Sequence, residues 1–188
     1  NKNELSKISN QFFTNQTGGN INNGQYTKRV SIGQPLGSFY LYEIAGIDDR
    51  GEFVYKDLNN DGEINENDRR FFGTYIPSLV SSFNIKVIYK NFDVNIATYG
   101  SFGNKVYNGK KAQRFGNENI EQFVFNNRWT SGRPSTNTPV ASNNVPLSSN
   151  YFLESGDYFR INNFTIGYTF EREKSKSFKN TRLYFTSK

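Results

Sequence analysis

The sequence contains no cysteine, no histidine and no methionine. Without cysteine the chain has neither disulfide bonds nor thiolate metal ligands. Without histidine it lacks the commonest acid–base catalyst, so a serine–histidine–aspartate triad and a histidine-ligated zinc site are both excluded. Paired carboxylates suffice for some hydrolases, but no such pair stands out beyond the acidic loop described below. We therefore predict that the protein is not an enzyme.

A start signal and a long apolar run are also missing. The chain does not begin with methionine, and its first residues, NKNELSKIS, contain no apolar signal core. We therefore expect a mature, processed or partial chain. No apolar run approaches the roughly 20 residues of a transmembrane helix. A membrane strand needs only about ten alternating residues and leaves a weaker signal.

Aromatic residues, in contrast, are abundant. Hydrophobic residues make up only 35% of the 188 residues, yet aromatic residues make up 16%. This chain is too aromatic to be disordered, and its apolar residues are mostly of types that favour strands. The composition therefore predicts antiparallel sheets with one face in contact with water.

The formal net charge of +6 raises the question of nucleic-acid binding. The densest basic cluster, FEREKSKSFKNTR, is interrupted by Glu171 and Glu173 and accompanies no nucleic-acid-binding motif. A solvated turn between strands is the simpler interpretation. We predict no nucleic-acid partner.

The stretch YKDLNNDGEINENDRR, from Tyr55 to Arg70, is typical of a calcium-binding loop. Such loops place oxygen donors at alternating positions, with glycine at the sixth position for the turn. Gly62 occupies that position. The flanking segments GEFVY and FFGTYIP favour strands and turns, so a helix–loop–helix unit is not expected. The predicted donors are Asp57, Asn59, Asp61, the Glu63 carbonyl, Asn65 and Asp68.

The predicted cofactor of this loop is a divalent cation, with calcium favoured and magnesium as the alternative. Asp68 stands where helical calcium loops carry a longer glutamate, which weakens the site or favours a smaller ion. A turn without metal also fits, because asparagine and aspartate bind their own backbone and glycine supplies positive φ. Turn chemistry alone, however, does not require an oxygen donor at every alternate position.

Alternating residues predict a β-hairpin from residue 81 to residue 103. The two runs, SSFNIKVIY and FDVNIATYGSFG, are joined by a tight connection at Lys90 and Asn91. Each run carries apolar residues on one face and polar residues on the other. The apolar face holds Phe83, Ile85, Val87, Phe92, Val94 and Ile96, and the polar face holds Asn84, Lys86, Asp93 and Asn95.

A further strand is predicted from Tyr158 to Phe170, and a shorter run, TRLYFTS, follows a charged turn. Phe159 and Ile161 fall on the opposite phase from Phe164 and Ile166. The change of phase predicts a bulge or twist near residues 162–163.

Between Asn104 and Asn150 the alternation dissolves into a long polar region with one tryptophan, Trp129. Trp129 is a candidate substrate-binding platform for a sugar or peptide. A lone tryptophan between Arg128 and Arg133 also suits an anchor that fixes a long loop, and this second role is the one we favour.

Half-polar sheets occur in soluble β-sandwiches and in membrane β-barrels. Three features favour the barrel: one very short and one very long connection, aromatic residues such as Tyr89 and Phe92 at strand ends, and Lys86 on the polar face. A secreted, calcium-stabilised β-sandwich that binds carbohydrate stays open as the alternative. A small self-contained barrel of about eight strands also fits the length.

Five short motifs occur in one order along the chain: GQPLGSFYLYEIAGI, DLNNDGEINENDRRFFG, YKNFDVNIATYGSFGNKVYN, NNRWTSGRP and SGDYFRINNFTIGYTF with the following TRLYF. From Gly33 to the end, these motifs resemble the C-terminal part of SusC/RagA-type TonB-dependent outer-membrane transporters. The resemblance implies an all-β fold of antiparallel strands from a large, about 22-stranded transmembrane barrel with long extracellular loops.

The same resemblance implies the function and the partners. Residues 1–188 would be the C-terminal portion of the barrel, without the plug domain. The whole transporter would import oligosaccharides or peptides across the outer membrane of a Gram-negative bacterium, with energy from TonB and with a SusD-like surface lipoprotein. Lipid would surround the strands, and the acidic loop would be an extracellular connection. We expect further strands to pair with both edges of this segment.

Overall fold

The computed structural model describes residues 3–7, 16–17, 25–114, 119–135, 137–142, 145–171 and 180–187. The chain forms two compact units. Unit 1 comprises Asn1–Ile76 and Asn104–Ser155, and unit 2 comprises Pro77–Gly103 and Gly156–Lys188. In the described ranges, no helix is long and apolar enough to cross a membrane.

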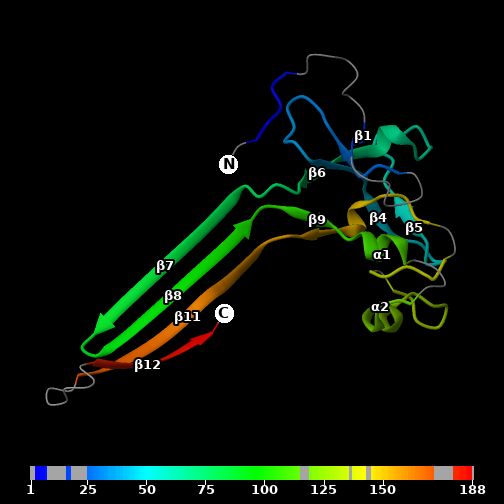
Figure 1. Cartoon of the computed structure of the whole chain (residues 1–188). Helices are drawn as coiled ribbons and strands as arrows, with labels where there is room; N and C mark the ends of the chain where they lie inside the picture. Colours follow the sequence, from blue (N-terminus) through cyan, green and yellow to red (C-terminus); the bar gives the residue numbers. More distant parts are fainter. Residues whose placement is uncertain are drawn as a thin grey trace. The chain divides into compact units, whose positions relative to one another are not determined.

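Unit 2 is a four-stranded antiparallel sheet in the order β12-β11-β8-β7. Its long strands lie side by side (Figure 1). The predicted hairpin is confirmed: β7 and β8 pair along their whole length, and Tyr89 faces Phe92 across a two-residue turn in which Lys90 has a φ of 51°. The strands are β7 (Leu79–Tyr89), β8 (Phe92–Phe102), β11 (Tyr158–Glu171) and β12 (Asn180–Ser187).

The predicted bulge in β11 is also confirmed. The register against β8 shifts between Ile161 and Asn163. Before the shift Ile161 lies opposite Thr98, and after it Phe164 lies opposite Ile96. Because Thr98 and Ile96 are two residues apart on β8, the bulge brings both apolar phases of β11 onto one face of the sheet.

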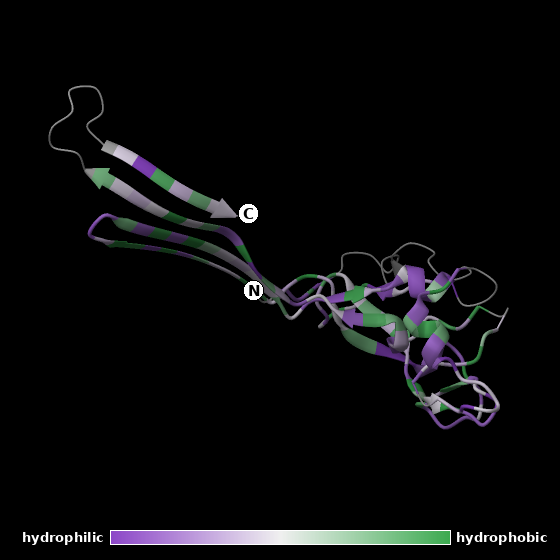
Figure 2. Cartoon of the chain, turned by 90° about the horizontal axis from the view of Figure 1, so that it is seen from below, coloured by the Kyte–Doolittle hydropathy of each residue, from purple (hydrophilic) through white to green (hydrophobic). Residues whose placement is uncertain are grey.

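That face of unit 2 is apolar on all four strands, and its large side chains are exposed. Hydropathy alternates along these strands (Figure 2). Ile85 is 55% exposed and Phe185 is 63% exposed, so this face is not the closed core that a β-sandwich requires. We call it the apolar face; its exposed members are Phe83, Ile85, Val87, Tyr89, Phe92, Phe159, Ile161, Ile166, Leu183 and Phe185.

Unit 1 contains short strands and turns around a small core. One sheet has the order β1-β2-β3-β6, and two further strand pairs are β4 with β5 and β9 with β10. The strands are β1 (Gln16–Thr17), β2 (Lys28–Arg29), β3 (Ser38–Tyr42), β4 (Ile44–Ile47), β5 (Phe53–Tyr55), β6 (Arg69–Thr74), β9 (Lys105–Tyr107) and β10 (Leu153–Ser155).

The long region after Asn104 is more regular than the sequence predicts. It contains β9 and two short helices, α1 (Gly109–Gln113) and α2 (Gln122–Asn127). Single-turn 3₁₀ helices lie at Glu66–Asp68 and Asn150–Phe152. These elements are too short to produce a recognisable period in the sequence. The buried apolar residues of the unit are Phe39, Leu41, Tyr42, Ala112 and Phe152.

Candidate functional site

The acidic loop between β5 and β6 begins with Asp57, whose carboxylate fixes the tightest part of the turn. Its Oδ1 accepts a hydrogen bond from the Asn60 backbone N–H at 2.6 Å, and its Oδ2 accepts one from the Gly62 N–H at 2.8 Å. Both donors have positive φ, 58° at Asn60 and 84° at Gly62. The glycine thus occupies the left-handed position that the pattern predicts.

Asp61 accepts hydrogen bonds from the side chains of two other predicted metal ligands, Asn59 and Asn65. Its Oδ2 accepts from the Asn59 amide at 2.7 Å and from the Asn65 amide at 3.4 Å, and its Oδ1 accepts the Glu63 N–H at 2.9 Å. The Glu63 N–H and the Asn59 amide lower the pKa of Asp61, because they stabilise its charged form. Three side chains expected to bind a cation therefore converge in this structure.

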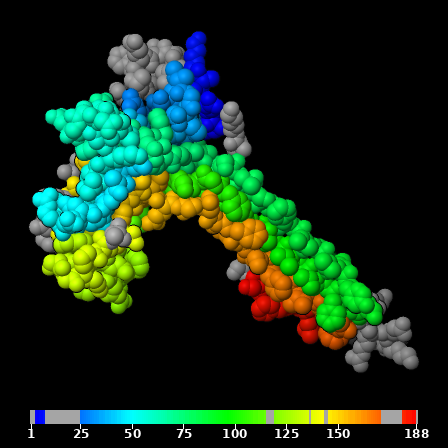
Figure 3. All heavy atoms as spheres, turned by 180° about the vertical axis from the view of Figure 1, so that it is seen from behind, coloured from blue at the N-terminus to red at the C-terminus, as the bar shows by residue number. Residues whose placement is uncertain are grey.

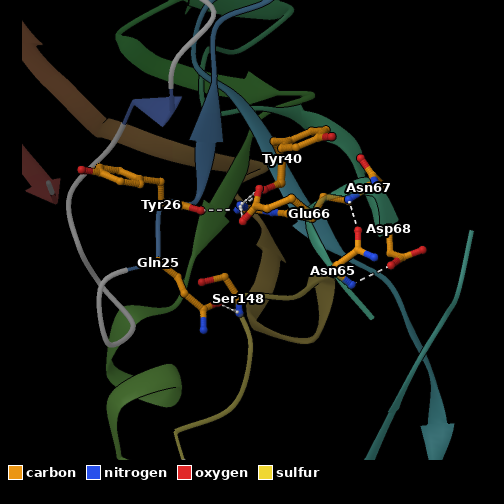
Figure 4. Close-up of polar contacts among 9 residues, drawn as sticks. Gln25, Tyr26, Tyr40, Asn65, Glu66, Asn67, Asp68 and Ser148 are labelled. Atoms are coloured by element: carbon orange, nitrogen blue, oxygen red, sulfur yellow. Dashed lines mark hydrogen bonds and ion pairs between the residues drawn. The ribbon is translucent and has the colours of Figure 1, made fainter. Parts of the chain in front are cut away.

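Asp68 closes the loop instead of lying at its surface. This residue is fully buried, and its two carboxylate oxygens accept the Leu58 and Asn65 N–H groups, both at 2.8 Å. The Asn65 side chain in turn accepts the Asn67 N–H, which completes a capping box (Figure 4). These backbone bonds, led by the one from Asn65, lower the pKa of Asp68.

The donor set fits a hard divalent cation, because every predicted ligand binds through oxygen. Within the part of the chain that the structure describes, no three acidic side chains form a metal-binding group. A cation in this loop would therefore depend on the Asn59 and Asn65 amide oxygens and on the Glu63 carbonyl as well as on carboxylates. The carboxylates keep lone pairs beyond those used for the backbone bonds.

Arg69 anchors the end of the loop to the sheet of unit 1, and nothing in the sequence pattern identifies it. Its buried guanidinium binds both Glu66 carboxylate oxygens at 3.0 Å and the Tyr40 carbonyl at 2.7 Å. It also donates to the Tyr26 carbonyl (Figure 4). The rings of Tyr40 and Tyr42 lie within cation–π range of this guanidinium, at 5.2 and 5.4 Å. The loop is thereby held to β3.

Trp129 is half-buried and packs on the turn between β4 and β5. Its backbone N–H donates to the Thr138 carbonyl at 3.0 Å, and the backbone N–H of Val140 donates to the Gly51 carbonyl at 2.8 Å. A Cβ atom added at Gly51 would lie only 2.5 Å from Cδ2 of the indole, so the ring lies directly on the glycine backbone. This contact is of the kind expected for an anchor. A role of Trp129 in substrate binding stays a prediction.

The polar face of unit 2 carries an ion pair that crosses a strand. Arg182 on β12 binds Asp93 on β8 through two hydrogen bonds, at 2.9 and 2.5 Å, although β11 runs between them. Gly167 on β11 leaves the space for this pair, since a Cβ there would lie 2.6 Å from an Asp93 oxygen. Nearby, the hydroxyls of Thr165 and Thr186 are 3.1 Å apart.

Comparison with known proteins relates this chain to bacterial receptors, although no family model matches it. It is 26% identical over 186 residues to TonB-dependent receptor P3 of Formosa agariphila, a match that covers 89% of the chain and 18% of that protein. It is 25% identical over 197 residues to TonB-dependent receptor SusC of Bacteroides thetaiotaomicron, covering 99% of the chain and 19% of SusC. The chain thus spans about a fifth of the length of these relatives.

Solved structures of the RagAB system share the fold. The chain matches the RagAB peptide transporter with a TM-score of 0.77 at 16% identity, covering 97% of this chain and 21% of that one. It matches the RagAB peptide importer in its closed-closed state with a TM-score of 0.75 at 17% identity, again over 97% and 21%. The predicted resemblance to SusC/RagA-type receptors and the antiparallel all-β fold class are confirmed.

Proposed function

We propose that this chain is part of a TonB-dependent outer-membrane transporter, in which the strands of unit 2 cross the membrane as one segment of a barrel wall. The observation that carries the proposal is the exposed apolar face. Its large side chains lie on all four strands and are between 39% and 67% exposed. So large a contiguous apolar surface is rare on soluble proteins and suits contact with lipid.

Strand length supports the same role. β7 and β8 have 11 residues each and β11 has 14. A tilted strand needs about 9 to 11 residues to cross the hydrocarbon core of a bilayer. The opposite face carries the Asp93–Arg182 pair and the Thr165–Thr186 contact, which suit the water-filled interior of a barrel. A secreted β-sandwich is not favoured, because it would bury Ile85.

A charged residue placed on either face tests this orientation. Ile85→Arg puts the charge on the lipid side, where it costs about 2 to 4 kcal/mol near the bilayer midplane. Asn84→Arg, one residue earlier, puts the same charge on the polar side and is the matched control. The measurement is the amount of folded, heat-modifiable protein in isolated outer membranes. We expect a strong loss for Ile85→Arg alone, and equal losses would contradict the proposal.

The support for a cargo and a partner comes from the relatives and not from the sheet. RagAB is a peptide importer, and SusC is a TonB-dependent receptor. We propose that the transporter imports an oligosaccharide or a peptide, depends on TonB and works with a SusD-like surface lipoprotein. Copurification of a surface lipoprotein from detergent extracts tests the partner. Uptake of labelled oligosaccharide or peptide by cells with and without TonB tests the energy source and the cargo.

The acidic loop has a structural role in this proposal. A divalent cation, calcium in the first instance, would join the Asp57 and Asp61 carboxylates to the amide and carbonyl oxygens around them. Its support is the convergence of Asn59, Asp61 and Asn65 through the hydrogen bonds described above. Calcium sites of extracellular modules have dissociation constants of about 0.1 to 1 mM, so such a loop would be occupied outside a cell.

A further inference from the structure

A cavity of about 320 Å³ lies in unit 1, between α1, α2 and the segment after Trp129. The chain around α2 forms part of the outer surface of this unit (Figure 3). One wall of the cavity is apolar, with Ile120, Val124 and Pro139, and the ring of Tyr151 also lines it. Cavities that combine an apolar wall with a few polar groups are the usual form of small-molecule sites.

The charged groups of the cavity are mostly cations. Four basic residues and two acidic ones line it, which leaves a net charge of +2. Lys110 is neutralised by Glu121 at 2.8 Å, and Glu154 accepts a hydrogen bond from the Asn108 amide at 2.9 Å. The remaining basic residues are Lys111, Arg114 and Arg128, of which Arg114 is exposed.

The Arg128 side chain has no hydrogen bond or ion pair among the described residues, and its Nε is buried without a partner there. A buried guanidinium nitrogen that lacks an acceptor is unfavourable, so the site favours an added acceptor. Lys111 is half-buried, lies 3.8 Å above the Tyr151 ring and donates to the Tyr151 carbonyl at 3.1 Å. Burial lowers the pKa of Lys111, and a bound anion would offset this effect.

We propose that this cavity binds an organic carboxylate, with Arg128 as the principal ligand and Lys111 as the second cation. A guanidinium binds a planar carboxylate through two parallel hydrogen bonds, and the apolar wall and the Tyr151 ring accommodate the carbon body of the ligand. The carboxylate belongs to an acidic sugar or to a peptide. This binding does not depend on the proposed transport, because the cavity lies within unit 1. A chain that imports nothing would still bind the carboxylate.

The single tryptophan of the chain provides the assay, since Trp129 follows Arg128 directly and bonds to Thr138 at the cavity. The full chain in detergent is titrated with glucuronate against glucose, with N-acetyl-dialanine against its amide, and with inorganic phosphate. Calorimetry repeats each titration without relying on fluorescence. We expect at least one carboxylate to bind 10-fold or more tightly than its uncharged match. The pair that shows the difference identifies the source as sugar or peptide.

Variants connect the binding to the cavity. Arg128→Gln is expected to weaken carboxylate binding by 10-fold or more, and Lys111→Gln by a smaller factor, while far-ultraviolet circular dichroism stays unchanged. Arg160→Gln makes the same charge change on an exposed arginine that does not line the cavity, and it should bind as the parent chain does. Uncharged matches that bind equally well, tighter binding of phosphate, or unchanged affinity in both Arg128→Gln and Lys111→Gln would overturn the proposal.

Discussion

The carboxylates of Asp57 and Asp61 accept hydrogen bonds from nearby backbone N–H groups, two at Asp57 and one at Asp61. Such bonds occur both in a metal-free turn and in a calcium-binding loop. The two interpretations differ in what happens when calcium is added. At a concentration ten times the dissociation constant, binding to the folded state alone contributes about 1.4 kcal/mol of stability. For a site with a dissociation constant of about 1 mM, that concentration is about 10 mM.

We therefore predict that about 10 mM calcium raises the free energy of unfolding of the parent chain by about 1.4 kcal/mol relative to chelator, as measured by denaturant titration in detergent. Asp57→Ala should lose this calcium-dependent gain. Asp48→Ala is the matched control, because Asp48 also caps a turn, accepting the Arg50 and Glu52 N–H groups, but lies outside the loop. A parent chain that gains nothing from calcium or magnesium would leave the metal-free turn as the correct interpretation.

Gly51 lies where an added Cβ atom would collide with the Trp129 indole. Its φ is 84°, and a Cβ would meet the Trp129 indole at 2.5 Å. We predict that Gly51→Ala lowers the free energy of unfolding by about 2 to 4 kcal/mol, from positive-φ strain and overpacking together. The emission of Trp129, the only tryptophan, should shift to longer wavelength.

Gly46→Ala is the control for this substitution, because Gly46 has no positive φ and no atom within 4 Å of the added Cβ. It should be close to neutral and leave the emission unchanged. An equal loss in both variants would show that the Trp129 contact on Gly51 contributes little, and the anchor role would lose its support.

The strand elements of unit 2 were the part of the fold most accessible to sequence reasoning. A strand with an apolar face and a polar face must alternate apolar and polar residues, so β7 and β8 can be predicted from their residues alone. The bulge in β11 can be predicted too, because Phe159 and Ile161 fall on the opposite alternation from Phe164. The elements α1, α2 and β9 were not, because three to six residues leave no measurable period.

The residues of the candidate site also divide into those that a local sequence pattern predicts and those that it does not. The acidic loop is a local motif, so its donors can be identified by spacing, whereas Arg69 acts through groups far along the chain. Arg69 reaches Tyr26 and Tyr40, which lie 43 and 29 residues away. Gly167 likewise matters only because the pairing of three strands places Asp93 and Arg182 on either side of it. No pattern within a short window reports such contacts.

Gly167 provides the prediction at the scale of the sheet. We expect Gly167→Ala to displace Arg182 from Asp93 and to lower the free energy of unfolding slightly, because an accessible ion pair contributes little to stability. A double-mutant cycle with Asp93→Asn isolates the effect. In the Asp93→Asn background the alanine should be neutral or slightly stabilising, because it restricts the unfolded chain. Equal losses in both backgrounds would mean that the pair is not what Gly167 protects.

For the whole molecule, the central question is what covers the apolar face of unit 2. Strands β7 and β12 stand at the two edges of its sheet, and unpaired backbone groups in lipid cost several kcal/mol each. In the proposed transporter, neighbouring strands of the barrel would pair with both edges and lipid would cover the apolar face. In a soluble sandwich, a second layer of protein would cover that face instead.

Spin labels at consecutive positions of the β7–β8 hairpin distinguish these cases most directly. Labels at Ile85, Val87 and Phe92, introduced singly into the full chain in lipid bilayers, should be relaxed by oxygen, which is concentrated in the hydrocarbon. Labels at Asn84, Lys86 and Asn95 should instead be relaxed by a water-soluble nickel reagent, so that accessibility alternates with a period of two. Labels at Ile85 and Val87 that are inaccessible to both reagents would place this face in a protein core and contradict the account.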